Sequence, residues 1–156
     1  MSDQDFMMTG NSKPHAKNLR NGRFAEPGRI YVITTVIRKR RPVFNDFKNA
    51  RLLIQVLMGH ERAGFARTLC FVVMPDHLHW IMQLGDDKNL GKTIHALKSI
   101  TSRKVGRSIF QKGYYDHAVR KEEDLKALGR YIVANPLRAG LVNNINDYPH
   151  WDAVWL

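Results

Sequence analysis

The segment that most constrains the fold is residues 71–84, FVVMPDHLHWIMQL. A Pro-Asp turn at 75–76 separates two apolar runs, 68–74 and 77–84, which predicts a hairpin of two strands. Side chains alternate between the two faces of a strand. In the second run one face carries only apolar side chains: Leu78, Trp80, Met82 and Leu84. Such a face has to be covered, so a second layer must pack on the sheet.

The other segments alternate between strand and helix patterns. β-Branched and aromatic runs predict strands, and apolar residues at helical spacing predict helices. Pro136 is expected to end the last helix, and the tail from there to Leu156 shows no regular period. The expected elements are a strand at 29–37, a helix from 45 or 46 to 64, strands at 68–74 and 77–84, a helix at 90–105, a strand at 115–120 and a helix at 122–135.

This order predicts an α+β fold, a ferredoxin-like split βαβ sandwich with an antiparallel sheet and helices on its faces. The chain has 156 residues, which suits one domain. We expect residues 28–156 to form that domain. Residues 1–27 show no sustained period and are expected to be a basic arm that stays flexible until it meets a partner.

The charge balance favours a polyanionic partner. Lys and Arg total 25 against 14 for Asp and Glu, a formal net charge of +11. Nucleic acid is the first expectation and an anionic membrane surface the second. Phosphate contacts are expected at about half of the following cations: Arg38, Arg40, Arg41, Lys98, Arg103, Lys104, Arg107, and in the arm Lys13, Lys17, Arg20 and Arg23.

Several other classes are disfavoured. The single cysteine, Cys70, excludes an internal disulfide framework and a multi-cysteine zinc site. The first residues lack the pattern of a secretory signal, and no apolar run approaches the roughly 20 residues of a membrane helix. The expectation is a soluble, cytoplasmic protein without a membrane partner.

Two histidines share one face of the 77–84 strand. His77 and His79 point the same way, opposite the apolar face. Residues two apart on a strand are about 6.6 Å apart, and two imidazoles that lean together can share one ion with nitrogens at about 2.1 Å. The alternative is a pair of histidines on a half-exposed strand that bond to nearby groups.

The last expected helix carries a tyrosine and an asparagine one turn apart. Leu125, Leu128 and Ile132 define its buried stripe, and Tyr131 and Asn135 lie on the flank of that stripe. The tyrosine could present its hydroxyl at the sheet, or it could be a boundary residue with its ring in the core. Three rival tyrosines are not eliminated by spacing: Tyr114, Tyr115 and Tyr148.

Three segments in this order resemble the single-tyrosine HUH transposases of bacterial insertion sequences, and most closely the REP-associated tyrosine transposases. They are VVMPDHLHWI, KGYYDHAVRKEEDL and YIVANPLRAGLV, and the resemblance runs from about residue 29 to 151. HUH denotes two histidines that flank a hydrophobic residue, here His77-Leu78-His79.

The resemblance implies metal-dependent cleavage and rejoining of single-stranded DNA beside hairpins formed by palindromic repeats. It implies Tyr131 as the nucleophile, with a phosphotyrosine intermediate. It further implies a divalent ion, Mg²⁺ or Mn²⁺, held by His77, His79 and Asn135. Some relatives share the tyrosine helix between subunits, so a monomer and a homodimer both stay open.

Two other functions stay open. The chain could bind structured nucleic acid without cutting it, or it could be a metal-dependent nuclease that uses water, with a structural Tyr131. A covalent protein–DNA adduct distinguishes the strand transferase from both.

Overall fold

A computed structural model describes residues 28–120 and 123–155. The expected basic arm at 1–27, with Lys13, Lys17, Arg20 and Arg23, lies outside the described residues. In the described part of the chain, no helix is long and apolar enough to cross a bilayer.

The sheet has five antiparallel strands in the order β4-β1-β3-β2-β5. Helix α3 connects β1 to β2, and helix α4 connects β3 to β4, so the first four strands form the expected ferredoxin-like split βαβ arrangement. The strands are β1 (Ile30–Val36), β2 (Ala66–Met74), β3 (His77–Leu84), β4 (Tyr115–Ala118) and β5 (Trp151–Ala153). The helices are α3 (Phe47–Arg62), α4 (Leu90–Val105), α5 (Leu125–Val133) and α6 (Asn135–Arg138), with short 3₁₀ turns η1 (Arg38–Arg40), η2 (Val43–Asn45) and η3 (Ile145–Asp147).

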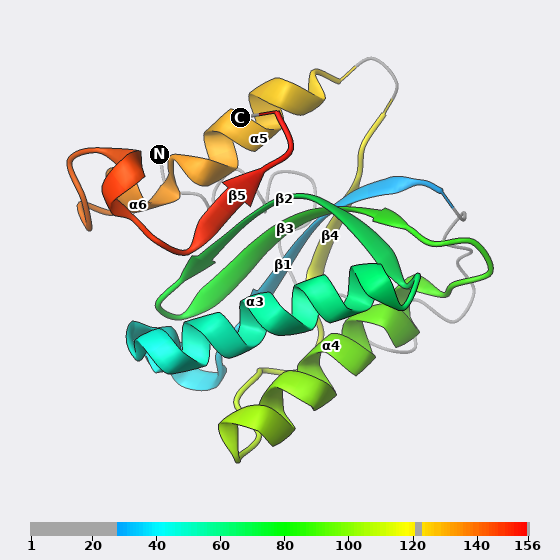
Figure 1. Ribbon diagram of the computed structural model, residues 1–156, viewed down its shortest axis with the longest axis horizontal. Helices are drawn as coiled ribbons and strands as arrows, with labels where there is room; N and C mark the ends of the chain where they lie inside the picture. Colours follow the sequence, from blue (N-terminus) through cyan, green and yellow to red (C-terminus); the bar gives the residue numbers. More distant parts are fainter. Residues whose placement is uncertain (1–27, 121–122, 156) are drawn as a thin grey trace.

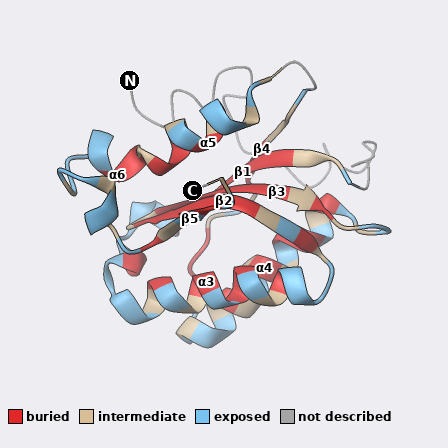
Figure 2. Ribbon diagram, turned by 45° about the horizontal axis from the view of Figure 1, so that its top comes forward, coloured by how far each residue is buried: buried red, intermediate tan, exposed pale blue. Residues whose placement is uncertain are grey.

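Helices cover both faces of the sheet: α3 and α4 lie on one side, and α5 and α6 on the other (Figures 1 and 2). The apolar face of β3 packs under α3 and α4, as its alternation predicts. Trp80 lies fully buried at the centre of that face, and its indole N–H donates to Thr68 Oγ1 at 3.0 Å. The histidines of β3 therefore point away from the layer formed by α3 and α4.

The opposite face of the sheet packs against α5. Ile132 and Val133 of that helix cluster with Val32, Val72 and Ile81 from three strands. Ile81 shares its strand face with His77 and His79, because side chains alternate along β3. The pair of histidines and the tyrosine helix are therefore on the same side of the sheet.

Side-chain caps begin the three long helices. Asp46 accepts a hydrogen bond from the Lys48 amide, Asn89 from the Lys92 amide and Asp124 from the Ala127 amide. Gly106, at φ 102°, ends α4 in the left-handed conformation that glycine adopts without strain. Helix α4 has the expected bounds, and α3 and the four predicted strands agree to within a few residues.

Two expectations about the end of the chain are wrong. The tail is not irregular throughout, because residues 151–153 pair with β2 as the edge strand β5. Helix α5 is also shorter than 122–135. Pro136 has no N–H to continue the hydrogen-bond ladder, yet its fixed φ suits a first helical turn, so it lies at the start of α6.

Helix α5 lies very close to the C-terminal segment because a glycine, Gly129, faces the ring of Trp155. A Cβ built on Gly129 would lie 2.5 Å from Trp155 Cζ3. Trp151 and Trp155, both half-buried, pack against the same apolar cluster as α5. The position of the tyrosine helix therefore depends on a glycine at 129.

We predict that Gly129→Ala lowers the free energy of unfolding by about 1–3 kcal/mol, because the new methyl group displaces the Trp155 ring. Gly59→Ala on α3 is the matched control, since its Cβ would meet only Arg62 Nη2 at 3.8 Å. That change should stabilise the protein by about 0.5–1 kcal/mol through helix propensity. Urea unfolding measures both, and equal stabilisation by the two substitutions would contradict the packing at Trp155.

Candidate active site

His77 and His79 form a buried pair on β3. Their ring centroids are 4.8 Å apart and the rings are nearly perpendicular, at 79°. His77 is 6% exposed and His79 is 0% exposed. The shared orientation is as expected. The half exposure in the alternative is wrong, because α5 and the neighbouring strands cover this face. The bonds to nearby groups that the alternative also expected are present.

The Nδ1 atom of His77 is tied to the turn that precedes it. It lies 2.6 Å from Asp76 Oδ1, and Asp76 Oδ2 lies 3.0 Å from Arg40 Nε. Burial alone would raise the pKa of Asp76, but the hydrogen bond from His77 and the charges of His77 and Arg40 outweigh it and lower that pKa. The carboxylate is therefore ionised at neutral pH and accepts the Nδ1–H of His77.

The Nδ1 atom of His79 is tied to the neighbouring strand. It lies 2.8 Å from Thr34 Oγ1, and Thr34 is the residue opposite His79 in the β1–β3 register. Burial, with the nearby charges of His77 and Arg40, holds the pKa of His79 well below its usual value. His79 is therefore neutral, and it has a lone pair on Nε2 when Nδ1–H donates to Thr34.

The Nε2 atoms of both rings are buried and have no hydrogen-bond partner among residues 28–120 and 123–155. A buried polar atom without a partner is destabilising, so two adjacent ones require an explanation. Two imidazole lone pairs fixed by hydrogen bonds at the opposite nitrogens are the usual arrangement of metal-binding histidines. Among the described residues, no cluster of three or more His, Cys, Asp or Glu side chains is suited to a metal.

Tyr131 and Asn135 meet through Arg138. The Arg138 guanidinium lies over the Tyr131 ring, with Cζ 3.8 Å from its centroid, and Nη2 donates to Asn135 Oδ1 at 2.8 Å. Asn135 is 0% exposed, more deeply buried than a position on the flank of the helix predicts. Its Nδ2 forms no hydrogen bond with any residue that the structure describes. Its Oδ1 keeps a second lone pair. Two imidazole nitrogens and an amide oxygen are a donor set that suits a divalent ion.

The structure separates the rival nucleophiles. Tyr114 is buried in the cluster under α3 and α4, on the other face of the sheet. Tyr148 donates its hydroxyl to the Val73 carbonyl at 2.5 Å, and burial raises its pKa to about 12. Burial, together with the charge of Asp152, raises the pKa of the Cys70 thiol to about 12. Tyr115 is opposite Thr34 in the β1–β4 register, so it shares the histidine face and stays a rival.

Two groups of expected phosphate-binding cations, at 38–41 and at 98–107, belong to segments that meet beside the end of β1. Residues Ile37 and Phe110 form a β-bridge, and Arg38 donates to Ser108 Oγ at 3.1 Å. Arg40 pairs with Asp76, and Lys98 donates to the carbonyls of Gln111 and Gly113. Among the described residues expected to bind phosphates, Arg41, Arg103, Lys104 and Arg107 are exposed and form no side-chain hydrogen bond or ion pair with another described residue.

Several residues beside the candidate site were not expected from the sequence. Thr34, Asp76 and Arg138 hold His79, His77 and Asn135, respectively. The position of Asp76, directly before His77, was a signal that could have identified it. Thr34 could be found only from the strand register.

A second unexpected contact ties β4 to the start of α5. His117 Nε2 lies 2.9 Å from both carboxylate oxygens of Glu123, and Glu123 also accepts the Arg120 amide N–H. Burial would raise the pKa of Glu123, but these hydrogen bonds and the charges of His117 and Arg120 outweigh it and lower that pKa. The Glu123 carboxylate therefore links the side chain of His117 and the backbone of Arg120 to the residue just before the N-cap of α5.

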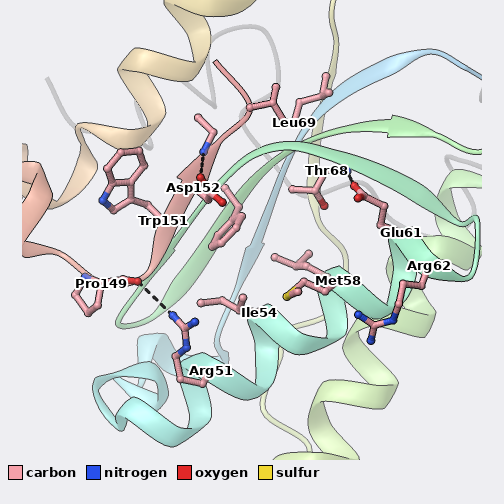
Figure 3. Close-up of a pocket in the computed structure, with 14 residues that line it drawn as sticks. Arg51, Ile54, Met58, Glu61, Arg62, Thr68, Leu69, Pro149, Trp151 and Asp152 are labelled. Carbon is pink, nitrogen blue, oxygen red and sulfur yellow. Dashed lines mark hydrogen bonds between the residues drawn. The ribbon is translucent and has the colours of Figure 1, made fainter. Parts of the chain in front are cut away.

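A pocket of about 490 Å³ lies elsewhere, between α3 and the β2–β5 edge of the sheet (Figure 3). Three of its charged side chains have partners within the chain: Arg51 donates to the Pro149 carbonyl, Glu61 accepts the Thr68 amide N–H, and Asp152 accepts the Ala153 amide N–H. None of the expected site residues lines it. The pocket is therefore separate from the histidine pair.

Comparison with known proteins shows which proteins this chain is similar to. A protein of Haemophilus influenzae described as a putative REP-associated tyrosine transposase is 26% identical over 144 residues, covering 79% of this chain and 78% of the relative. The REP-associated tyrosine transposase of Escherichia coli K12 is 31% identical over 81 residues, covering 51% of this chain and 49% of the relative.

Solved structures share the fold. A REP-associated tyrosine transposase bound to a REP hairpin aligns with a TM-score of 0.73 at 24% identity, over 83% of this chain and 79% of that one. A transposase from Deinococcus radiodurans aligns with a TM-score of 0.53 at 19% identity, over 74% and 96%. The family model for IS200-like transposases matches residues 28–135. The chain therefore belongs to the IS200-like transposase family of enzymes.

Proposed function

We propose that this chain nicks and rejoins single-stranded DNA beside a hairpin, with Tyr131 as the nucleophile and a divalent ion held by His77, His79 and Asn135. The observation that carries the proposal is the pair of buried Nε2 atoms without partners, on the side of the sheet that α5 covers. The similarity of the chain to REP-associated tyrosine transposases supports a reaction of this class.

The chemistry at Tyr131 is a transfer of one phosphoryl group. The phenol oxygen attacks a backbone phosphorus, the bond from phosphorus to the leaving deoxyribose oxygen breaks, and that oxygen takes up a proton. Tyr131 loses its own proton to water or to a base that we do not assign. The phosphotyrosine keeps the energy of the broken linkage, so attack by a deoxyribose hydroxyl rejoins the strand without a nucleotide cofactor.

A phenol with a pKa near 10 is a weak nucleophile at neutral pH. A bound Mg²⁺ or Mn²⁺ would polarise a phosphoryl oxygen and stabilise the charge that develops there. The part played by the protein is to hold the ligands in place: Asp76 and Thr34 orient the two rings through Nδ1. This division of roles applies to a monomer and to a homodimer.

The DNA partner is inferred from charge and from relatives. One related structure is described as bound to a REP hairpin. In this chain, Arg38 and Arg41 follow β1 directly, and Arg107 lies beside Ser108, which bonds Arg38. Phosphates of a hairpin could bind along this surface toward His77, which is opposite Val36 at the end of β1.

We predict that Tyr131→Phe abolishes the covalent adduct with labelled single-stranded hairpin DNA and Mn²⁺, because the attacking oxygen is removed. Tyr115→Phe is the matched control and should keep most of the adduct. A denaturing gel measures the adduct, and anisotropy shows that hairpin binding persists in both variants. Cleavage without any adduct in the wild type would favour a water-dependent nuclease, and binding without cleavage a non-cutting module. A normal adduct in Tyr131→Phe would refute the role of Tyr131.

We predict that His79→Ala weakens Mn²⁺ binding by about 100-fold or more, because one of two imidazole ligands is lost. His95→Ala, at an exposed position on α4, should leave the affinity unchanged. The paramagnetic resonance signal of free Mn²⁺ measures binding without any assay of activity. Equal Mn²⁺ affinity in His79→Ala and the wild type would contradict the proposed ligand.

We predict opposite effects for valine at two adjacent threonines of β1. Thr34→Val leaves Nδ1 of a fully buried histidine without a partner, which should cost about 1–3 kcal/mol of stability and reduce Mn²⁺ affinity about tenfold. Thr35→Val removes a buried hydroxyl that has no hydrogen-bond partner, so stability should be unchanged or higher. Thermal unfolding compares them, and a neutral Thr34→Val would show that its hydroxyl does not hold His79.

A further inference from the structure

Arg138 makes three contacts with the two residues that the proposed reaction needs on the helical side of the site. Its Cζ lies 3.8 Å from the centre of the Tyr131 ring. Its Nη2 lies 2.6 Å from the Tyr131 carbonyl oxygen and 2.8 Å from Asn135 Oδ1. One planar cation therefore contacts the ring, the backbone and the carboxamide at once.

The chain keeps these residues on one face in spite of the break at Pro136. Tyr131, Asn135 and Arg138 are separated by four and three residues, the spacing of one helical face. The amide of Arg138 bonds to the carbonyl of Ala134, and Gly140, two residues after the end of α6, turns the chain with φ 74°. The short α6 is therefore fixed at both ends, and Arg138 is turned back toward Tyr131.

The contact with Asn135 also decides which way its carboxamide faces. A guanidinium can only donate, so it must meet the oxygen and not the amide nitrogen. This leaves the second lone pair of Oδ1 as an acceptor site and directs Nδ2 elsewhere. Burial of part of the side chain lowers the pKa of Arg138, although the residue as a whole is exposed.

We propose that Arg138 is a positioning residue that holds the Tyr131 ring and the Asn135 carboxamide in one fixed arrangement. The inference rests on the proposed function, because it assigns roles to both of those residues. Arginine suits the task because its planar fork can stack on a ring and donate to separate acceptors, whereas lysine is a flexible point charge. Lysine at 138 should therefore keep the charge and lose the arrangement.

The test separates positioning from charge and from folding. Arg138→Lys and Arg138→Gln are compared with Arg130→Gln, which removes one positive charge from an exposed position on α5. We expect both Arg138 variants to slow single-turnover adduct formation at least about tenfold at saturating hairpin DNA and Mn²⁺. Their dissociation constants for the hairpin should stay within about threefold of that of Arg130→Gln. A full rate in Arg138→Lys, or a loss explained entirely by weaker DNA binding, would overturn the inference.

A spectroscopic measurement tests the contact without activity. The chain has five tyrosines, so ring resonances of ¹³C-labelled protein can be resolved, and Tyr131→Phe assigns the Tyr131 signal. We expect Arg138→Lys to shift that signal and Arg130→Gln to leave it in place. An unmoved signal in folded Arg138→Lys would contradict the inference. A normal adduct in Tyr131→Phe would instead refute the proposed function and leave the contact measurable.

Discussion

The arrangement of the site depends on two buried imidazoles, each held by a hydrogen bond at Nδ1. Asp76 holds His77 from the turn before β3, and Thr34 holds His79 from the strand beside it. These bonds leave both Nε2 atoms in the interior without a partner in the described part of the chain, and a missing hydrogen bond there is destabilising. Such a cost is understandable at a binding site, because a ligand that meets both nitrogens relieves it.

The rest of the fold keeps this pair rigid. The apolar side of β3 packs under α3 and α4, so β3 cannot slip by one residue without exposing Trp80 and moving the histidines to the wrong face. The opposite side of the sheet packs against α5. Ile132, the residue that follows Tyr131, packs among side chains of the strands. The side chain of Trp155 fixes α5 at Gly129. Both halves of the proposed site are therefore set by packing at some distance from them.

Much of this could be predicted from local patterns. The alternation along β3 and the helical spacing in α4 correctly predicted a strand and a helix. The order of all the predicted strands and helices correctly predicted the fold class. The resemblance to REP-associated transposases and the expectation of an enzyme of the transposase class are confirmed by the family match. The histidines share a face, as the period of two requires.

The features that could not be predicted depend on contacts between distant segments. Strand β5 forms because the edge of β2 is free to pair with it. Its three residues are too few to show the alternation that would predict a strand. The burial of Asn135 and the contact of Arg138 with it depend on how α6 is oriented after the break at Pro136. Helical spacing alone does not describe that orientation. The roles of His77, His79, Tyr131 and Asn135 stay predictions that chemistry must test.

The most direct measurement is the anomalous scattering of Mn²⁺ in crystals of the protein. If the buried nitrogens are a metal site, one manganese peak lies about 2.1 Å from Nε2 of His77 and of His79. In the same map, the amide oxygen of Asn135 faces that peak and the hydroxyl of Tyr131 lies beside it. A manganese peak at another place, or an empty histidine pair at saturating Mn²⁺, would contradict the account.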